Sequence, residues 1–354
     1  MYTKLLTKYA LGGNTLVNRI CLPPMAVWAA TESGHVTDYI LQHYSGVQGV
    51  GLAIVEATAV SPEGRLAKLQ LGAWSDDHIP GLKQLATAIK ATGALPGIQI
   101  HHAGRSTNRE KTFGAELVAP SAVTTGQDIP MALTIAGIES IVEKYATAAA
   151  RVVEAGFKVI ELHGAHGYLI SQFLSPTSNL RNDEYGGTLE NRARFALEVF
   201  TAVKKVVGSK ALVSMRLGVA DSVEGGLHLG DGVQVARWLE TAGADLLHIS
   251  SGIGGAPQQL RLDHDDFSPL LHLAATVKQH VRIPVIGVGS IRKPDQAERA
   301  LELGMADIIA VGRGILADPL WAAKAASQPA SISLCRGCRP CGHFKHPFSC
   351  PARQ

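Results

Sequence analysis

Short apolar runs alternate with amphipathic stretches along the chain, and this alternation is the main guide to its fold. Eight apolar runs have the length of buried strands, and they cover residues 20–23, 52–58, 96–101, 158–163, 212–217, 246–251, 284–289 and 308–312. Their near-continuous apolar character is typical of parallel strands that are buried on both faces. Between them, helical periodicity predicts helices such as 138–154 and 189–206, with Thr188 as the N-cap of the second.

Eight alternating units predict an α/β protein with a closed (β/α)8 barrel, the TIM barrel architecture. The length of 354 residues fits one such domain, which we place at residues 1–328, followed by a short Cys-rich tail at 329–354. From the pattern alone, an open doubly wound sheet remains the alternative. Two long segments, 105–134 and 164–187, follow the third and fourth strands and carry His, Tyr, Arg and Asn. Because barrel enzymes build their sites after the strand C-termini, we expect function there.

Composition and charge exclude several classes of protein. Apolar residues make up 46% of the chain and the formal net charge is +3, with no basic run and no interleaving of basic and aromatic residues. We therefore expect no nucleic-acid partner. No 18-residue apolar run and no signal-peptide pattern is found, so we expect no membrane span and a cytoplasmic location.

The most specific chemistry lies in the stretch ELHGAHGYLISQFLSPTSNLRNDEYGGTLENRARF, which begins at Glu161. His163 ends a predicted strand, His166 follows three residues later, and Tyr168 follows two residues after that. Two imidazoles this close can donate to one oxygen and stabilise developing negative charge, and a phenol can supply a proton. Two satisfied loop histidines beside a packed tyrosine are the structural alternative.

This stretch resembles the signature of the old yellow enzyme family. Besides the histidine pair, it contains S-x-x-x-N-x-R-x-D-x-Y-G-G and N-R-x-R-F elements, formed by Ser175, Asn179, Arg181, Asp183, Tyr185, Gly186, Gly187, Asn191, Arg192, Arg194 and Phe195. The resemblance implies FMN, NAD(P)H as reductant and small α,β-unsaturated carbonyl or nitro compounds as acceptors. It implies that His163 and His166 bind the acceptor oxygen and that Tyr168 protonates the product carbon. A homo-oligomer is compatible with the family.

The resemblance also implies positions for the flavin ring. The segment Pro23, Pro24, Met25 and Ala26 follows the first strand and resembles the segment that lies against the ring. Ala57 and Gln99 resemble the residues on its pyrimidine side, and Arg216 resembles the family arginine near the N1–O2 edge. A fixed cation there would stabilise the anionic reduced flavin. From the residues alone, Arg216 could equally form a structural ion pair.

A phosphate site is predicted from the residues themselves. Gly289 and Ser290 end the seventh strand, and Gly312 and Arg313 end the eighth. The loops after these two strands commonly bind phosphate in such barrels, and an arginine adds a bidentate cation. Glycines alone would be weak support, because most of them at strand ends only turn the chain.

Two positions depart from the family pattern. Ala26 stands where many relatives carry Cys or Thr beside the flavin O4 edge, and it has no side-chain donor. We therefore expect a lower flavin potential, which Ala26→Cys should raise. Trp28 stands where relatives often carry Tyr, and we expect it either to wall the substrate pocket or to fill the core.

The C-terminal tail carries a cysteine cluster in the pattern C-x2-C-x2-C-x8-C, formed by Cys335, Cys338, Cys341 and Cys350. It resembles the cluster of trimethylamine dehydrogenases and 2,4-dienoyl-CoA reductases, which hold a [4Fe–4S] cluster after the barrel with a longer last spacing. The alternatives are an unliganded remnant and a zinc site, held by the four thiolates or by a mixed set that includes His343 or His346. The fifth cysteine, Cys21, lies in an apolar run and is expected to be a buried small hydrophobe.

Three functions compete at this stage. The first is an FMN-dependent ene-reductase that uses NAD(P)H. The second is a flavin amine dehydrogenase or demethylase that passes electrons to a C-terminal cluster, which the cysteine spacing favours and the histidine pair disfavours. The third is a redox- or metal-responsive flavoprotein whose tail senses.

Overall fold

The computed structural model describes residues 2–257, 266–344 and 349–353. Its centre is a closed barrel in which each strand pairs in parallel with its neighbours. In barrel order the strands are β3 (Ile20–Leu22), β4 (Leu52–Ala59), β5 (Leu95–His101), β8 (Val159–Gly164), β9 (Leu212–Gly218), β10 (Leu246–Ser250), β11 (Val285–Val288) and β12 (Ile308–Ala310). All eight predicted strands are present. The (β/α)8 prediction is confirmed, and the open sheet is excluded.

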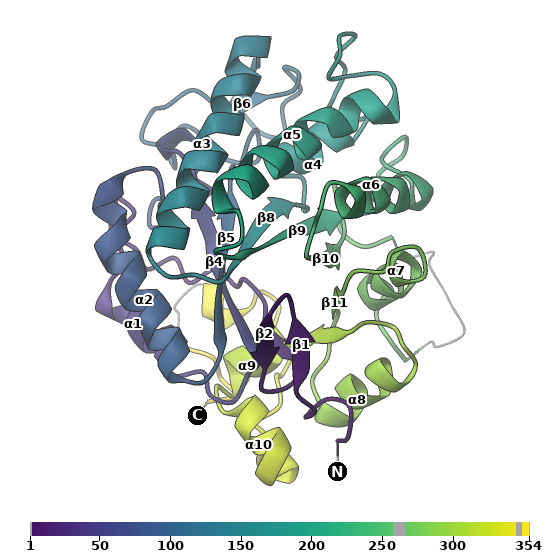
Figure 1. Ribbon diagram of the computed structural model, residues 1–354. Helices are drawn as coiled ribbons and strands as arrows, with labels where there is room; N and C mark the ends of the chain where they lie inside the picture. Colours follow the sequence, from purple (N-terminus) through teal and green to yellow (C-terminus); the bar gives the residue numbers. More distant parts are fainter. Residues whose placement is uncertain (1, 258–265, 345–348, 354) are drawn as a thin grey trace.

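Helices surround this ring of strands (Figure 1). They are α1 (Asp38–Ser45), α2 (Ile79–Ala91), α3 (Ile135–Glu154), α4 (Leu169–Leu174), α5 (Leu189–Val207), α6 (Leu229–Thr241), α7 (Pro269–Lys278), α8 (Pro294–Glu302), α9 (Arg313–Ala317) and α10 (Trp321–Ser327). The predicted cap of α5 is confirmed, because the Thr188 side chain accepts from the Asn191 N–H. None of the described helices is both long enough and apolar enough to span a lipid bilayer.

A hairpin that the sequence pattern did not predict closes the N-terminal end of the barrel. It consists of β1 (Tyr9–Leu11) and β2 (Asn14–Leu16). Leu11 and Leu16 are buried in one cluster with the first inward residues of the barrel strands, among them Leu52 and Leu212. The turn is tight against the barrel, because a Cβ on Gly12 would lie 2.3 Å from Leu212 Cδ2. The strand pair β6 (Val118–Ala119) and β7 (Met131–Ala132) lies in the long loop after β5.

The barrel interior changes character along each strand. Alternate strand residues point to the same side, so Leu212, Ser214 and Arg216 all face inward on β9. Leu212 belongs to the apolar cluster at the bottom, whereas Ser214 and Arg216 are buried polar residues above it. Polar groups therefore accumulate toward the C-terminal end of the strands, the end at which barrel enzymes place their sites.

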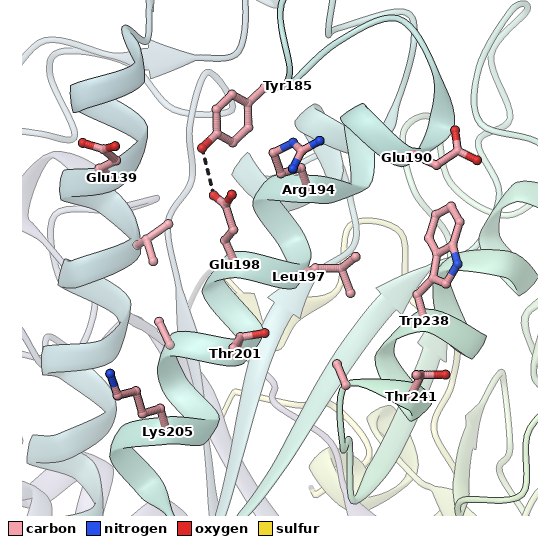
Figure 2. A pocket seen from close by; sticks show the side chains of 13 residues that line it. Glu139, Tyr185, Glu190, Arg194, Leu197, Glu198, Thr201, Lys205, Trp238 and Thr241 are labelled. Atoms are coloured by element: carbon pink, nitrogen blue, oxygen red, sulfur yellow. Dashed lines mark hydrogen bonds between the residues drawn. The ribbon is translucent and has the colours of Figure 1, made fainter.

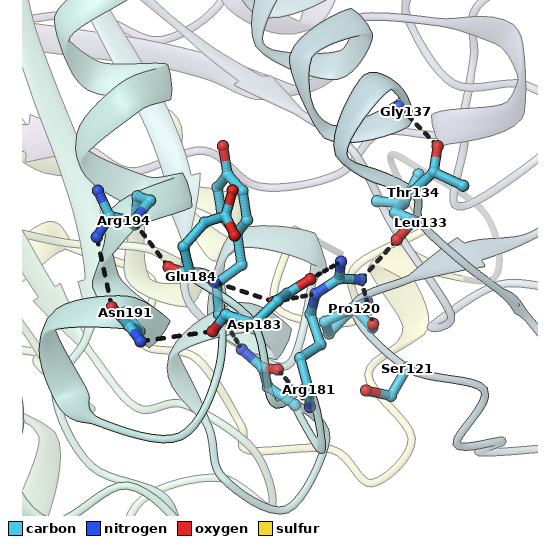
Figure 3. Close-up of polar contacts among 12 residues, drawn as sticks. Pro120, Ser121, Leu133, Thr134, Gly137, Arg181, Asp183, Glu184, Asn191 and Arg194 are labelled. Atoms are coloured by element: carbon cyan, nitrogen blue, oxygen red, sulfur yellow. Dashed lines mark hydrogen bonds and ion pairs between the residues drawn. The ribbon is translucent and has the colours of Figure 1, made fainter.

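The downstream half of the signature motif fastens the two long loops together (Figure 3). The Arg181 guanidinium donates to the carbonyl oxygens of Pro120 at 3.0 Å and Leu133 at 2.5 Å, and it forms an ion pair with Asp183. Asn191 in turn donates to the Asp183 carbonyl. These residues join the loop after β5 to the loop after β8, so the motif stabilises the two long loops that follow these strands.

Candidate active site

The predicted histidine pair lies at the C-terminal end of the barrel. His163, on β8, is 3% exposed, and His166 is exposed in the loop that follows. His166 Nδ1 lies 3.3 Å from His163 Nε2, so the two rings can face one oxygen. The end of β10 holds His166 in place: its N–H donates to the Ser251 carbonyl at 2.9 Å, and its Nε2 lies 2.7 Å from Ser250 Oγ.

Both imidazoles are neutral. Burial and the neighbouring His166 lower the pKa of His163 well below its ordinary value. Desolvation in the crowded barrel mouth and the charge of Arg216 lower the pKa of His166 in the same way, although part of this ring still faces solvent. The Ala165 N–H donates to His163 Nδ1 at 3.3 Å, so the proton of His163 resides on Nε2, the atom that faces the site. His163 is thus set as a hydrogen-bond donor.

Tyr168 completes the predicted catalytic group. Its ring packs edge-on against His163, with 4.7 Å between the ring centroids. Burial raises the pKa of Tyr168, and Arg216 opposes this shift. The phenol therefore stays protonated at neutral pH and keeps a proton to donate.

A third histidine, which the sequence analysis did not select, joins the group. His101 ends β5, and its ring centroid lies 4.6 Å from that of Tyr168 and 5.4 Å from that of His163. Burial lowers the pKa of His101 to about 3, so this ring is neutral as well. Neither of its nitrogens has a hydrogen-bond partner among the described residues. Its position two residues after Gln99 is the signal that could have identified it, because residues i and i+2 of a strand share a face.

Backbone strain marks the same region. Among the described residues, four non-glycine residues have φ near +55°, and three of them are candidate site residues: Trp28 at 54°, His166 at 59° and Ser290 at 53°. Such conformations are costly and tend to cluster at functional sites. The strain supports the assignment of these loops to the site.

A buried polar layer lies directly below the histidines. Glu161 is fully buried and accepts from Gln99 Nε2 at 2.7 Å and from His248 Nδ1 at 2.9 Å. Burial lowers the pKa of His248, against the opposing effect of Glu161, so this contact is a hydrogen bond to a neutral ring. The Gln99 amide nitrogen is thus held by Glu161 on the neighbouring strand, and its carbonyl oxygen, which has no partner among the described residues, can accept from a ligand. Sequence reasoning selected Gln99 and missed its two partners.

The segment after β3 forms one wall of the site. Pro23 is buried, and Met25 and Ala26 are half-buried. Glu56, which is buried on β4, fixes the segment by accepting from the Val27 N–H at 2.7 Å and from the Trp28 N–H at 3.4 Å. Trp28 itself is half-buried, which favours a pocket wall over core filling.

The neighbouring strand also contributes to this wall. Pro24 is half-buried. Ala57 lies where the register of β4 and β5 shifts, and its carbonyl accepts from Gln70 Nε2 at 2.7 Å. The predicted flavin-ring residues thus come from adjacent elements of the barrel.

The predicted phosphate loops line a cavity of about 470 Å³. Gly289, Ser290, Gly312 and Arg313 line it together with Arg216, whose buried Nε has no partner in the part of the chain that the structure describes. Glycine is required at 289, because a Cβ would lie 1.9 Å from Ser268 Oγ. Close backbone approach, unpaired cations and the absence of carboxylates from the described lining fit the phosphate end of FMN.

A larger groove of about 990 Å³ lies on the outer surface between α3, α5 and α6 (Figure 2). Trp238 and Leu197 line it, and a hydrogen bond of 3.0 Å joins Tyr185 to Glu198 at its edge. The groove is formed by the outer helices and contains none of the predicted catalytic residues. We therefore assign the candidate active site to the barrel mouth.

The tail cysteines are free thiols, and three of them, Cys335, Cys338 and Cys341, line the phosphate cavity. Within residues 2–257, 266–344 and 349–353, no group of three or more His, Cys, Asp or Glu side chains is placed to hold a metal ion. The structure therefore does not support the predicted metal or iron–sulfur site. Cys350 is half-buried.

The zinc alternative with tail histidines is likewise not supported. His343 is turned inward, and its Nε2–H donates to the Ala26 carbonyl at 3.1 Å. His346 lies outside the described residues. Cys21 is fully buried, as expected, and burial raises the pKa of its thiol.

Comparison with known proteins identifies the family. The sequence model of the NADH:flavin oxidoreductase / NADH oxidase family matches residues 4–331. The chain is 42% identical over 330 residues to an NADH oxidase of Thermoanaerobacter brockii, which covers 92% of this chain and 51% of that protein. It is 40% identical over 349 residues to an NADPH dehydrogenase of Geobacillus sp. (strain WCH70), and this match covers 96% of this chain and 100% of that protein. The chain thus spans about half the length of the first relative and all of the second.

Structural similarity agrees with the sequence comparison. The old yellow enzyme homologue from Zymomonas mobilis matches with a TM-score of 0.83 and 26% identity, over 94% of each chain. The chain therefore belongs to the NADH:flavin oxidoreductase / NADH oxidase family. The old yellow enzyme resemblance is confirmed, and a flavin and a reduced nicotinamide are the redox partners that the family description and its members' names indicate.

Proposed function

We propose that the protein is an FMN-dependent ene-reductase that uses NAD(P)H to reduce the C=C bond of small α,β-unsaturated carbonyl or nitro compounds. The observation that carries the proposal is the pair of neutral imidazoles with His163 Nε2 and His166 Nδ1 3.3 Å apart, beside a protonated Tyr168. An oxygen that gains negative charge is the ligand that this group fits best.

The residues of the barrel mouth can hold FMN along its whole length. In this proposal the phosphate would be held by Gly289, Ser290, Gly312 and Arg313, and Arg216 would hold the pyrimidine edge of the ring. The Arg216 guanidinium is buried, and its Nε has no partner among the residues that the structure describes. This favours an anionic ligand over a structural ion pair.

The remaining contacts of the proposal concern the ring. Gln99 would accept from the pyrimidine side with its free carbonyl oxygen, and Ala57 would pack beside it. The ring face would be covered by Pro23, Pro24, Met25 and Ala26. Trp28 borders the space for the acceptor. When bound, the flavin supplies hydride chemistry, because it takes a hydride from NAD(P)H and passes it to an acceptor carbon.

The protein residues account for the rest of the reaction. His163 and His166 donate to the acceptor oxygen and polarise the C=C bond. One carbon of that bond gains the hydride equivalent of NAD(P)H, and the other gains the proton of the Tyr168 phenol. Water then returns a proton to Tyr168, so each cycle consumes one NAD(P)H and one proton per reduced double bond.

The first test is an anaerobic visible spectrum of the purified protein before and after NADPH and then 2-cyclohexenone. Flavin bands that bleach with NADPH and return with the enone are the expected result. Bands that bleach with N-methylated amines and do not respond to enones would instead support the amine dehydrogenase alternative. A protein without flavin would refute the proposal.

The roles of the residues are separated by the two half-reactions. Tyr168→Phe should slow reoxidation by cyclohexenone and leave reduction by NADPH unchanged, because only reoxidation needs the proton of the phenol. Trp74→Phe is the control, because Trp74 is a half-buried aromatic side chain that packs against His78 and is not part of the proposed catalytic group. Equal slowing of both half-reactions in Tyr168→Phe would contradict the proton-donor role.

The tail cysteines also need a direct measurement. Iron, sulfide and zinc should be quantified in protein purified anaerobically, beside a variant with Cys335, Cys338, Cys341 and Cys350 replaced by Ser. Iron and sulfide in equal amounts that depend on these thiols would support the cluster predicted from the sequence. Protein without metal would leave the tail, residues 329–354, as a purely polypeptide extension of the barrel domain.

A further inference from the structure

The C-terminal tail lies over the phosphate cavity. Beyond α10 the chain forms short 3₁₀ turns at Pro329–Ser331 and Gly342–Phe344. The described lining of the cavity combines the phosphate loops with tail residues, namely Cys335, Cys338, Arg339, Pro340, Cys341 and Phe344. One wall of the cavity therefore comes from a segment that the family signature does not include.

Two of the hydrogen bonds that hold the tail in this position reach the segment after β3 and helix α9. His343, which is 1% exposed, donates to the Ala26 carbonyl at 3.1 Å and so attaches the tail to the segment after β3. Arg353 Nε donates to the Leu316 carbonyl at 2.8 Å, which attaches the end of the described chain to α9. Arg339 lies four residues before the first of these anchors in the sequence.

The charge of the cavity calls for an anion of more than one negative charge. Arg216, Arg292, Arg313 and Arg339 all line it, and no Asp or Glu does so in the described part of the chain. Across the described ranges, none of these four guanidinium groups forms an ion pair with a carboxylate. A phosphate monoester carries nearly two negative charges at neutral pH and pairs well with guanidinium groups.

We propose that the tail is part of the cofactor site, and that Arg339 binds the FMN phosphate opposite Arg313. The inference rests on the proposed function, because it assumes that FMN occupies this cavity. It assigns a cofactor-binding role to a tail whose cysteine pattern suggested a metal site, a sensing role or an unliganded remnant. Arg339 closes the open side of the phosphate site, and the anchor at Ala26 couples the tail to the ring end of the same cofactor.

The neighbouring Arg336 provides a matched control. Both arginines are exposed and lie three residues apart in the tail, but only Arg339 lines the cavity. The full-length protein should be stripped of flavin and titrated with FMN and with riboflavin, which lacks the phosphate. Wild type, Arg339→Ala, Arg339→Lys and Arg336→Ala are compared at low and at moderate salt.

We expect Arg339→Ala to raise the Kd for FMN about tenfold, the effect of losing one charge-assisted hydrogen bond, and to leave riboflavin binding unchanged. Arg339→Lys should recover part of the loss, and Arg336→Ala should behave as wild type. Equal effects of the two alanine substitutions, or equal losses for FMN and riboflavin, would overturn the inference. Unchanged riboflavin binding shows that the variant is folded. Wild-type protein that binds neither flavin would refute the proposed function itself, a distinguishable outcome.

Discussion

Ser250 sets the donor capacity of His166, and replacing it by alanine tests how the histidine pair works. In the structure His163 Nε2–H can donate to His166 Nδ1, and His166 Nε2–H can donate to Ser250 Oγ. An acceptor oxygen needs a hydrogen on both facing nitrogens. His166 must then carry its proton on Nδ1, and the Ser250 hydroxyl must turn to donate to Nε2.

The size of the effect follows from this exchange. Without the hydroxyl, the productive tautomer of His166 leaves Nε2 without its partner, and an unsatisfied group of this kind costs about 1–3 kcal/mol. That range corresponds to roughly a 5- to 150-fold loss, at about 1.4 kcal/mol per factor of ten. The upper limit is the loss of the whole donor, about 10²–10³-fold in rate.

The assay is anaerobic stopped-flow measurement of both half-reactions. Ser250→Ala should slow reoxidation by cyclohexenone within this range and leave reduction by NADPH near the wild-type rate. Ser250→Thr keeps the hydroxyl and should recover most of the rate. Ser214→Ala is the matched control, because Ser214 is also buried in the barrel and its Oγ has no partner among the described residues. Reoxidation of Ser250→Ala at the wild-type rate would refute this account of the tautomers.

Three further predictions concern groups around the site. Glu161→Gln should weaken FMN binding roughly 2- to 10-fold, because it releases the Gln99 amide. In a double-mutant cycle of FMN titrations, the effect should disappear when Gln99 is already replaced by Ala. Burial raises the pKa of Glu56 to about 8 from 4.5, so between these pH values the folded state binds a proton that the unfolded state has lost. The free energy of unfolding should therefore fall as the pH rises from 4.5 to 8, by up to about 1.4 kcal/mol per pH unit. Glu56→Gln should flatten that slope in urea titrations; an unchanged slope would place the titration elsewhere. Arg181→Ala should cost about 3 kcal/mol and speed proteolysis within residues 105–134, whereas Arg109→Ala, at an exposed ion pair, should have little effect.

The barrel could be predicted because its strands are buried on both faces and thus stand out as apolar runs. Helical periodicity and the capping residue Thr188 gave both ends of α5 to within one residue. For α3 periodicity gave the C-terminal end, but the helix begins three residues before the predicted start. The β1–β2 hairpin escaped prediction because its strands have three residues each, and only Leu11 and Leu16 are buried. Three residues are too few to establish a period, and the hairpin gains its stability from the barrel it closes.

The site shows a similar division. Local spacing placed His163, His166 and Tyr168 together, since they lie within six residues of one another. The partners Ser250 and His248 come from β10, about 85 residues further along the chain, and only the pairing of β10 with β9, and of β9 with β8, brings them to the site. No local pattern contains that information. The tail shows the converse limit. Its cysteine spacing predicted a metal site, whereas the structure places three of the four thiols at the cavity of the predicted phosphate loops.

The vertical order of the barrel interior explains why one strand can serve both stability and chemistry. On β8 the inward residues are Val159, Glu161 and His163, which lie in the apolar floor, in the hydrogen-bonded middle layer and in the candidate site, respectively. In the middle layer both side-chain oxygens of Glu161 have a donor, Gln99 Nε2 for one and His248 Nδ1 for the other, and these hydrogen bonds fix the groups above them. Substitutions in the apolar floor should therefore change the stability of the protein without changing its reaction rates. Those in the middle layer should change both, since a lost hydrogen bond there removes a support of the site and leaves a charge buried.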